Sequence, residues 1–75
     1  MDFKKLEEEF KTVGCDNMAI FFDWLSHYYT STNAESEQEN YNKVYGFLWG
    51  MSVCGKISAE FRNSLIDQII DDMKY

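Results

Sequence analysis

The side chains in this sequence that could carry out nucleophilic chemistry are two cysteines, Cys15 and Cys54, and a single histidine, His27. Covalent catalysis needs a thiolate beside a base that is itself held in place, so a Cys15–His27 or a Cys54–His27 pair is the arrangement to consider. A lone histidine close to the end of an expected helix is more typical of a surface or capping position. We therefore interpret the chain as non-catalytic.

Carboxylates near the C-terminus could bind a cation, because Asp67 and Asp71 lie one helical turn apart and Asp72 is adjacent. A calcium site needs six or more oxygen ligands, and the spacing of an EF-hand loop is missing. Zinc is disfavoured as well, since neither cysteine belongs to a Cys-x-x-Cys or Cys/His ligand pattern. We predict no metal and no other cofactor, and interpret these acids as a solvated face.

The balance of charges is acidic, with 13 Asp and Glu against 7 Lys and Arg. A protein that grips nucleic-acid phosphates needs clustered Lys and Arg, so we expect no direct contact with DNA or RNA. An acidic surface can instead imitate phosphates and block a DNA- or RNA-binding host protein, as an anti-restriction or anti-CRISPR inhibitor would. The candidate residues for such a mimic are Glu7, Glu8, Glu9, Glu35, Glu37, Glu39, Asp67, Asp71 and Asp72.

Helices must position these side chains, because the sequence has no proline and only 4 glycines. We expect an all-α fold, a compact bundle of three to four short helices that forms a single domain over residues 1–75. Asp2 is suited to cap the first helix and Gly14 to end it in a left-handed conformation. Its buried face is predicted to contain Phe3, Leu6, Phe10 and Val13.

The second helix is expected to begin after a cap at Asp16 or Asn17. Its broad apolar face is formed by Met18, Phe21, Phe22, Leu25, Tyr28 and Tyr29, widened by Ile20 and Trp24. Residues 30–35 are predicted to be a loop, with two capping-box matches, Thr32-x-x-Glu35 and Ser36-x-x-Glu39. The third helix should then begin between Asn33 and Glu37 and end at Gly55. Ser58 is the expected cap of the last helix, which carries apolar stripes from Phe61 to Met73.

An uncharged run, "YGFLWGMSVCG", occupies residues 45–55. It is too short to cross a bilayer, which needs roughly 20 apolar residues, and it lacks the Gly-Lys-Ser/Thr ending of a phosphate-binding loop. On a helix, Gly46, Gly50 and Cys54 form a strip of small side chains that lets another backbone approach closely. The sequence predicts close packing there, either within the chain or between chains. It also predicts two free, mostly buried cysteine thiols, with a Cys15–Cys54 disulfide as the alternative.

Aromatic residues make up 17% of the sequence and are the expected anchors of an apolar interface with another protein. The candidate interface consists of Trp24, Tyr28, Tyr29, Gly46, Phe47, Trp49 and Gly50. Plain burial in the core is the competing interpretation for these aromatic rings. The partner is expected to be another protein. It is either a second copy in a homodimer or a protein that lays a helix in a groove built around Gly46 and Gly50.

The pattern "YGFLWG...CGKISAEF...L...I" resembles the small acidic helical accessory proteins encoded by bacterial phages and mobile elements. The resemblance covers the C-terminal half and implies a lineage of small regulators and inhibitors of host machinery, without a named family or transferred functional residues. The N-terminal residues alternate charged and apolar side chains and contain no signal-peptide core, so we expect the protein in the cytoplasm and not in a membrane.

Overall fold

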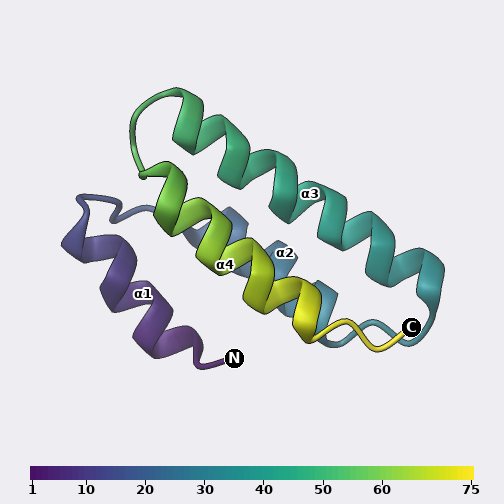
Figure 1. The fold of residues 1–75 in the computed structure, drawn as a ribbon. Coiled ribbons are helices and arrows are strands. Elements are labelled where there is room, and N and C mark those ends of the chain that lie inside the picture. Colours follow the sequence, from purple (N-terminus) through teal and green to yellow (C-terminus); the bar gives the residue numbers. More distant parts are fainter.

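Four helices make up the computed structural model, which describes all 75 residues (Figure 1). They are α1 (Phe3–Thr12), α2 (Ala19–Tyr29), α3 (Ala34–Val53) and α4 (Ala59–Asp71). The predicted all-α bundle is confirmed. None of the four helices combines the length and the apolar character that a bilayer crossing requires.

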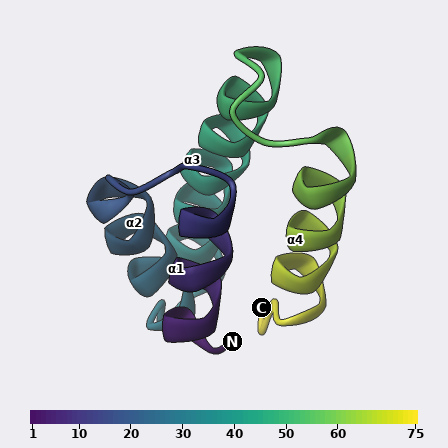
Figure 2. The same ribbon diagram turned by 90° about the vertical axis from the view of Figure 1, so that its left-hand side faces the viewer.

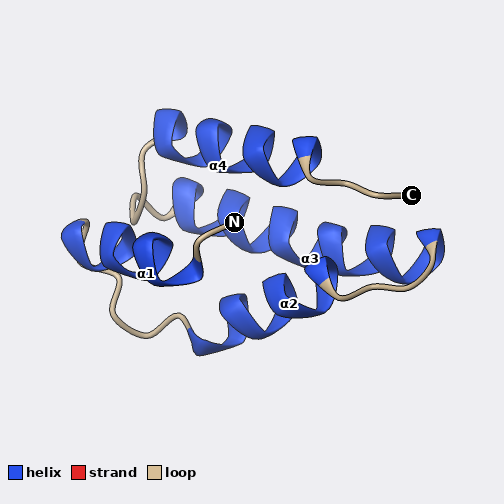
Figure 3. Ribbon diagram, turned by 90° about the horizontal axis from the view of Figure 1, so that it is seen from below, coloured by secondary structure: helices blue, strands red, loops and turns tan.

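The longest helix, α3, packs against both α2 and α4. Viewed from the side, α1 lies between α2 and α4 with α3 behind them (Figure 2). The view from below shows α3 between α4 and α2, with short loops joining consecutive helices (Figure 3). Because α1, α2 and α4 all lie to one side of α3, the opposite side of α3 has no covering helix.

Local capping explains where most helices begin and end. The Asp2 side chain accepts a hydrogen bond from the Lys5 amide at 3.1 Å, and Ser58 accepts one from the Phe61 amide at 3.0 Å. Gly14 and Gly55 have φ angles of 83° and 76°, in the region that side chains with a β-carbon avoid. The predicted caps and glycine stops at these four positions are confirmed.

Two other predicted caps are wrong. The residue before α2 is Met18, without a side-chain capping bond, because Met18 is buried in the core and its burial sets the start of the helix. Neither capping box is used at α3. Instead, Asn33 accepts a hydrogen bond from the Ser36 amide at 2.8 Å, which is the bond an N-cap side chain supplies.

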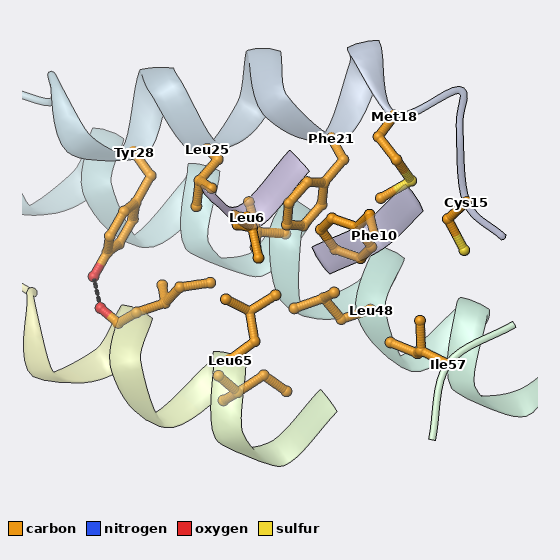
Figure 4. Packing of buried hydrophobic residues seen from close by; sticks show 13 residues of the cluster. Leu6, Phe10, Cys15, Met18, Phe21, Leu25, Tyr28, Leu48, Ile57 and Leu65 are labelled. Carbon is orange, nitrogen blue, oxygen red and sulfur yellow. Dashed lines mark hydrogen bonds between the residues drawn. The ribbon is translucent and has the colours of Figure 1, made fainter. Parts of the chain in front are cut away.

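A single apolar core lies between the helices (Figure 4). Phe10 of α1 is fully buried, and its ring centroid lies 5.3 Å from those of both Phe21 in α2 and Phe61 in α4. Edge-on and tilted ring contacts of this kind add to the hydrophobic gain from burial. Leu48 of α3 and Ile69 of α4 complete the centre of the core. Val13, predicted to join the buried face of α1, is exposed, because the helix has already ended at Thr12.

Candidate functional site

The uncovered side of α3 contains the exposed residues of the uncharged run identified in the sequence. We call this surface the open face, and its exposed residues are Tyr45, Gly46, Trp49, Gly50, Val53 and Cys54. The exposed fractions are 41% for Tyr45, 38% for Trp49 and 80% for Val53. Large apolar side chains are more often buried, so three of them on one surface of a helix make this surface the candidate site.

Gly46 and Gly50 form the middle of the open face. Apart from neighbouring atoms of the helix itself, nothing lies within 4 Å of the point where a β-carbon would stand on either glycine. The predicted close packing therefore does not occur within the chain. Both residues have ordinary negative φ angles, so the backbone does not require glycine. Each weakens the helix by about 1 kcal/mol relative to alanine, and no contact inside the molecule offsets that cost.

An aromatic ridge runs along one side of these glycines. The ring centroids of Tyr41 and Tyr45 are 5.7 Å apart, and those of Tyr45 and Trp49 are 6.2 Å apart. The guanidinium of Arg62, on α4, lies 3.6 Å from the centroid of the Trp49 ring and donates to the Ser52 hydroxyl at 2.8 Å. A cation over an aromatic face is an attractive contact, so Arg62 restrains the ring while Trp49 stays 38% exposed.

A shallow apolar groove runs along the other side of the glycines. It has a volume of about 370 Å³ and is lined by Phe47, Gly50, Met51, Cys54 and Lys56. A second depression, of about 410 Å³, continues from Phe47, Met51 and Lys56 to the loop between α1 and α2. The two glycines of the open face thus lie between an aromatic ridge and an apolar groove. Lys56 lies at the C-terminal end of that groove.

The remaining aromatic residues of the predicted interface lie elsewhere. Tyr28 is only 1% exposed and donates a hydrogen bond to the Ile69 carbonyl, so its assignment to a partner-binding surface is wrong. Trp24 is half-buried, with its ring centroid 5.8 Å from that of Phe47. Tyr29 is half-buried and donates to Asp72 at 2.6 Å. Of the predicted set, the structure brings together Gly46, Trp49 and Gly50, with Phe47 at the edge of the groove.

Glu37 belongs to a different feature, which we call the C-terminal clasp. Its carboxylate accepts hydrogen bonds from the backbone amides of Lys74 at 2.8 Å and Tyr75 at 3.1 Å. The Lys74 ammonium donates in turn to the carbonyls of Tyr29 at 2.8 Å and Ser31 at 3.4 Å. Glu37 is 1% exposed, so its prediction as part of an acidic surface is wrong.

Burial beside the clasp affects two tyrosine hydroxyls. Burial, together with the smaller effects of the charges on Glu37 and Asp72, raises the pKa of Tyr28 to about 12. Burial also raises the pKa of Tyr29, with its hydrogen bond to Asp72 as the next cause. Both side chains act as neutral hydrogen-bond donors, which suits a structural role.

The other eight acidic candidates are exposed but lie in three groups. The groups are Glu7, Glu8 and Glu9 on α1, Glu35 and Glu39 on the first half of α3, and Asp67, Asp71 and Asp72 at the end of α4. Glu7 pairs with Lys11 at 3.3 Å. Two neighbouring depressions lie between α1 and α4. Glu9 lines one of them together with Lys5, and Asp71 and Asp72 line the other.

The residues considered for chemistry are distributed as follows. Cys15 is a buried free thiol, and its sulfur lies 3.8 Å from the Lys56 carbonyl. Cys54 is free but exposed, which corrects the expectation that both thiols are mostly buried. It is exposed because α3 presents the whole strip from Gly46 to Cys54 to solvent. His27 lies on the surface, 4.0 Å from Asp23. No group of three or more His, Cys, Asp or Glu side chains converges anywhere in the chain.

The sequence interpretation missed Tyr45 and Val53. Tyr45, Trp49 and Val53 recur every four residues, next to the Gly46, Gly50 and Cys54 strip. That spacing places both rows on one side of a helix.

Comparison with protein-family models, with curated proteins and with solved structures finds no match to this chain.

Proposed function

We propose that this protein is a non-catalytic binding module that recognises another protein through the open face of α3. The observation that carries the proposal is the pair of glycines at Gly46 and Gly50, which weaken an exposed helix without packing against anything in the chain. Glycine at such positions permits the closest approach of a second backbone. A partner seated on the open face accounts for both glycines.

The side chains around the glycines support the same function. Trp49 and Tyr45 offer rings that can be desolvated on binding, and tryptophan and tyrosine are enriched among the residues that dominate binding energy. Arg62 holds Trp49 in one orientation before any partner arrives. A ring that is already fixed loses less conformational entropy on association.

Site-specific photo-crosslinking tests this proposal. Cys54 is the exposed thiol of the chain, and Cys15 is buried, so a maleimide benzophenone will attach to the open face without mutation. The matched control is Cys54→Ser combined with Glu8→Cys, which moves the same probe to the exposed surface of α1. We expect protein adducts in lysate from the Cys54 probe and few from the α1 probe.

A further variant, Gly50→Leu carrying the Cys54 probe, checks that the adducts report binding. The leucine has open space, so the monomer keeps its fold, but the close approach is blocked. Loss of the adducts supports the proposal. Adducts of equal yield from both probe positions, or adducts unaffected by Gly50→Leu, contradict it.

A second function, an acidic mimic that blocks a nucleic-acid-binding host protein, is favoured by one observation. Glu9, Asp71 and Asp72 line neighbouring depressions between α1 and α4, where a basic partner could meet several carboxylates. In that case the α1 probe gives the adducts, and they weaken steeply as salt rises, because charge attraction is screened. An apolar contact at the open face holds through the same salt range.

The proposed role is that of a small regulator or inhibitor, in line with the resemblance to accessory proteins of phages and mobile elements. We propose the cytoplasm as its compartment. The supporting observation is the exposed free thiol of Cys54, which persists unpaired where the surroundings are reducing.

A further inference from the structure

We propose that the occupant of the open face is the open face of a second copy of this chain, docked antiparallel about a two-fold axis. This inference rests on the proposed function, since it names the partner of the same surface.

The charge distribution restricts where two copies can approach. Each copy has a net charge of −6, so most pairs of surfaces repel. From Val44 to Gly55 the sequence contains no charged residue, and the charged residues at either end of this stretch are Lys43 and Lys56, both basic. The open face is therefore a surface where two acidic copies meet without bringing carboxylates together.

The exposed positions of α3 form a seam suited to helix pairing. Glu39, Lys43, Gly46, Gly50 and Val53 are all exposed. They follow one another at intervals of four, three, four and three residues, which is the spacing that keeps one line of a helix against a partner helix. At 1.5 Å per residue this seam is about 21 Å long. Gly46 and Gly50 lie at its centre, where the two helices come closest.

The charges at the ends of the seam select the antiparallel orientation. With the two-fold axis level with Leu48, Gly46 faces the second copy's Gly50. Glu39 is then level with the turn that contains the second copy's Lys56, a residue that already lines the groove beside Gly50 and Cys54. The ion pairs within the chain are Glu7–Lys11 and Asp23–His27, so Glu39 and Lys56 are both available. A parallel pairing would instead place Glu39 against Glu39 of the second copy, where the two like charges repel.

The aromatic ridges also meet in this arrangement. A two-fold axis perpendicular to both helices keeps the ridge of each copy on the same side, so Tyr45 and Trp49 face Trp49 and Tyr45 of the second copy. One helix face per copy buries an area at the low end for specific complexes. We expect a weak dimer with a dissociation constant on the order of 10 to 100 µM.

Sedimentation equilibrium of the purified chain from about 5 µM to 1 mM tests this inference. The wild type is expected to shift from monomer to dimer over this range, and Gly50→Leu is expected to stay monomeric with an unchanged helical circular dichroism spectrum. A monomeric wild type at the highest concentration, or a Gly50→Leu variant that dimerises equally well, overturns the inference.

Charge reversal tests the register. Lys56→Glu and Glu39→Lys each turn two symmetry-related attractions into repulsions and should weaken the dimer about tenfold. The combined variant, Glu39→Lys with Lys56→Glu, should restore the wild-type constant to within about twofold. The matched control is Glu35→Lys, which changes the net charge equally but lies beyond the seam. Failure of the combined variant to recover overturns the antiparallel arrangement.

Chemical crosslinking gives a third, independent readout. In the antiparallel register Lys43 lies beside the second copy's Cys54, so Lys43→Cys and a short bis-maleimide should link the two copies, while the wild type, with Cys54 alone, should link poorly. Efficient linking of wild type through Cys54 overturns the register. A monomeric pure chain whose Cys54 probe still captures another protein removes this inference and leaves the proposed function standing.

Discussion

The two ends of α3 contrast in how their side chains are satisfied. At its N-terminal end Glu37 is buried and accepts two backbone amides from the C-terminal clasp, while Lys74 closes the end of α2. At its C-terminal end the open face exposes Trp49 and Val53 around two unpacked glycines. At the first end, the polar groups find hydrogen-bond partners within the chain. At the second, an apolar surface stays uncovered and its two glycines lower the stability of the helix. We propose that this difference separates stability from binding along a single helix.

The largest expected effect comes from opening the clasp. Glu37→Ala removes a buried carboxylate that accepts two charge-assisted hydrogen bonds, from the part-buried amides of Lys74 and Tyr75, so we expect the free energy of unfolding to fall by about 3 kcal/mol. Urea unfolding followed by circular dichroism measures it. Glu35→Ala, at an exposed acid two residues earlier on the same helix, is the control and should cost no more than about 0.5 kcal/mol. Equal effects of the two changes would mean that the clasp contributes nothing.

On the open face, substitution is expected to raise the free energy of unfolding instead of lowering it. Because nothing lies near either glycine, Gly46→Ala combined with Gly50→Ala should raise the free energy of unfolding by about 2 kcal/mol through helix propensity alone. Thermal unfolding at low protein concentration, where the monomer dominates, measures this gain. A matched control is Gly55→Ala, which should destabilise, since φ is 76° there. A destabilised double variant would reveal an intramolecular use for the glycines.

The buried hydroxyl of Tyr28 provides a second test of the contacts beside the C-terminal clasp. Tyr28→Phe removes the donor to the buried Ile69 carbonyl and should cost about 1 kcal/mol at neutral pH. Burial raises the pKa of Tyr28 from 10.0 to about 12. The fold therefore favours the protonated phenol, so this stability is fully present below pH 10 and is lost as pH rises toward 12.

Unfolding of wild type and Tyr28→Phe between pH 8 and pH 12 measures that dependence. We expect the wild type to lose stability more steeply above pH 10 than the variant does. Tyr29 and Tyr41, whose pKa values burial also raises, keep part of the slope in both proteins. Tyr45→Phe, on the open face, is the control. Parallel pH profiles for wild type and Tyr28→Phe would contradict a buried Tyr28 hydroxyl beside the C-terminal clasp.

The smallest effect is expected at Arg62, which links the open face to α4. Arg62→Ala removes the contact with the Trp49 ring and the hydrogen bond to Ser52, and should lower stability by about 0.5 kcal/mol because the contact is partly solvated. Tryptophan fluorescence in the folded state provides a second readout, since the ring gains freedom. An unchanged spectrum and unchanged stability would show that Arg62 does not hold Trp49.

Local rules predicted the features that depend on a few adjacent residues. Asp2, Ser58, Gly14 and Gly55 cap or stop helices as expected, because each effect acts within one turn. Met18 shows where such rules fail, since burial against the core outweighs the capping preference of its neighbours. The all-α fold follows from helical periodicity and an absence of proline, both visible in the sequence.

The candidate site was predictable only in part. The strip of Gly46 and Gly50 was evident from spacing, but whether another helix of the same chain covered it depended on the arrangement of all four helices. Glu37 was indistinguishable from its acidic neighbours, because its burial depends on residues 37 and 38 positions later in the chain. Tyr28 lies on the predicted apolar face of α2, and of its two interpretations from the sequence, interface anchor or plain core residue, the structure confirms the second.

The most direct test of the central claim measures association of the stabilised double variant. Sedimentation equilibrium of wild type and of Gly46→Ala with Gly50→Ala, at matched concentrations up to about 1 mM, compares their dimer dissociation constants. If the glycines are kept for close approach of a second copy, the double variant is more stable as a monomer yet dimerises about tenfold more weakly. Equal dissociation constants for the two proteins would contradict the account.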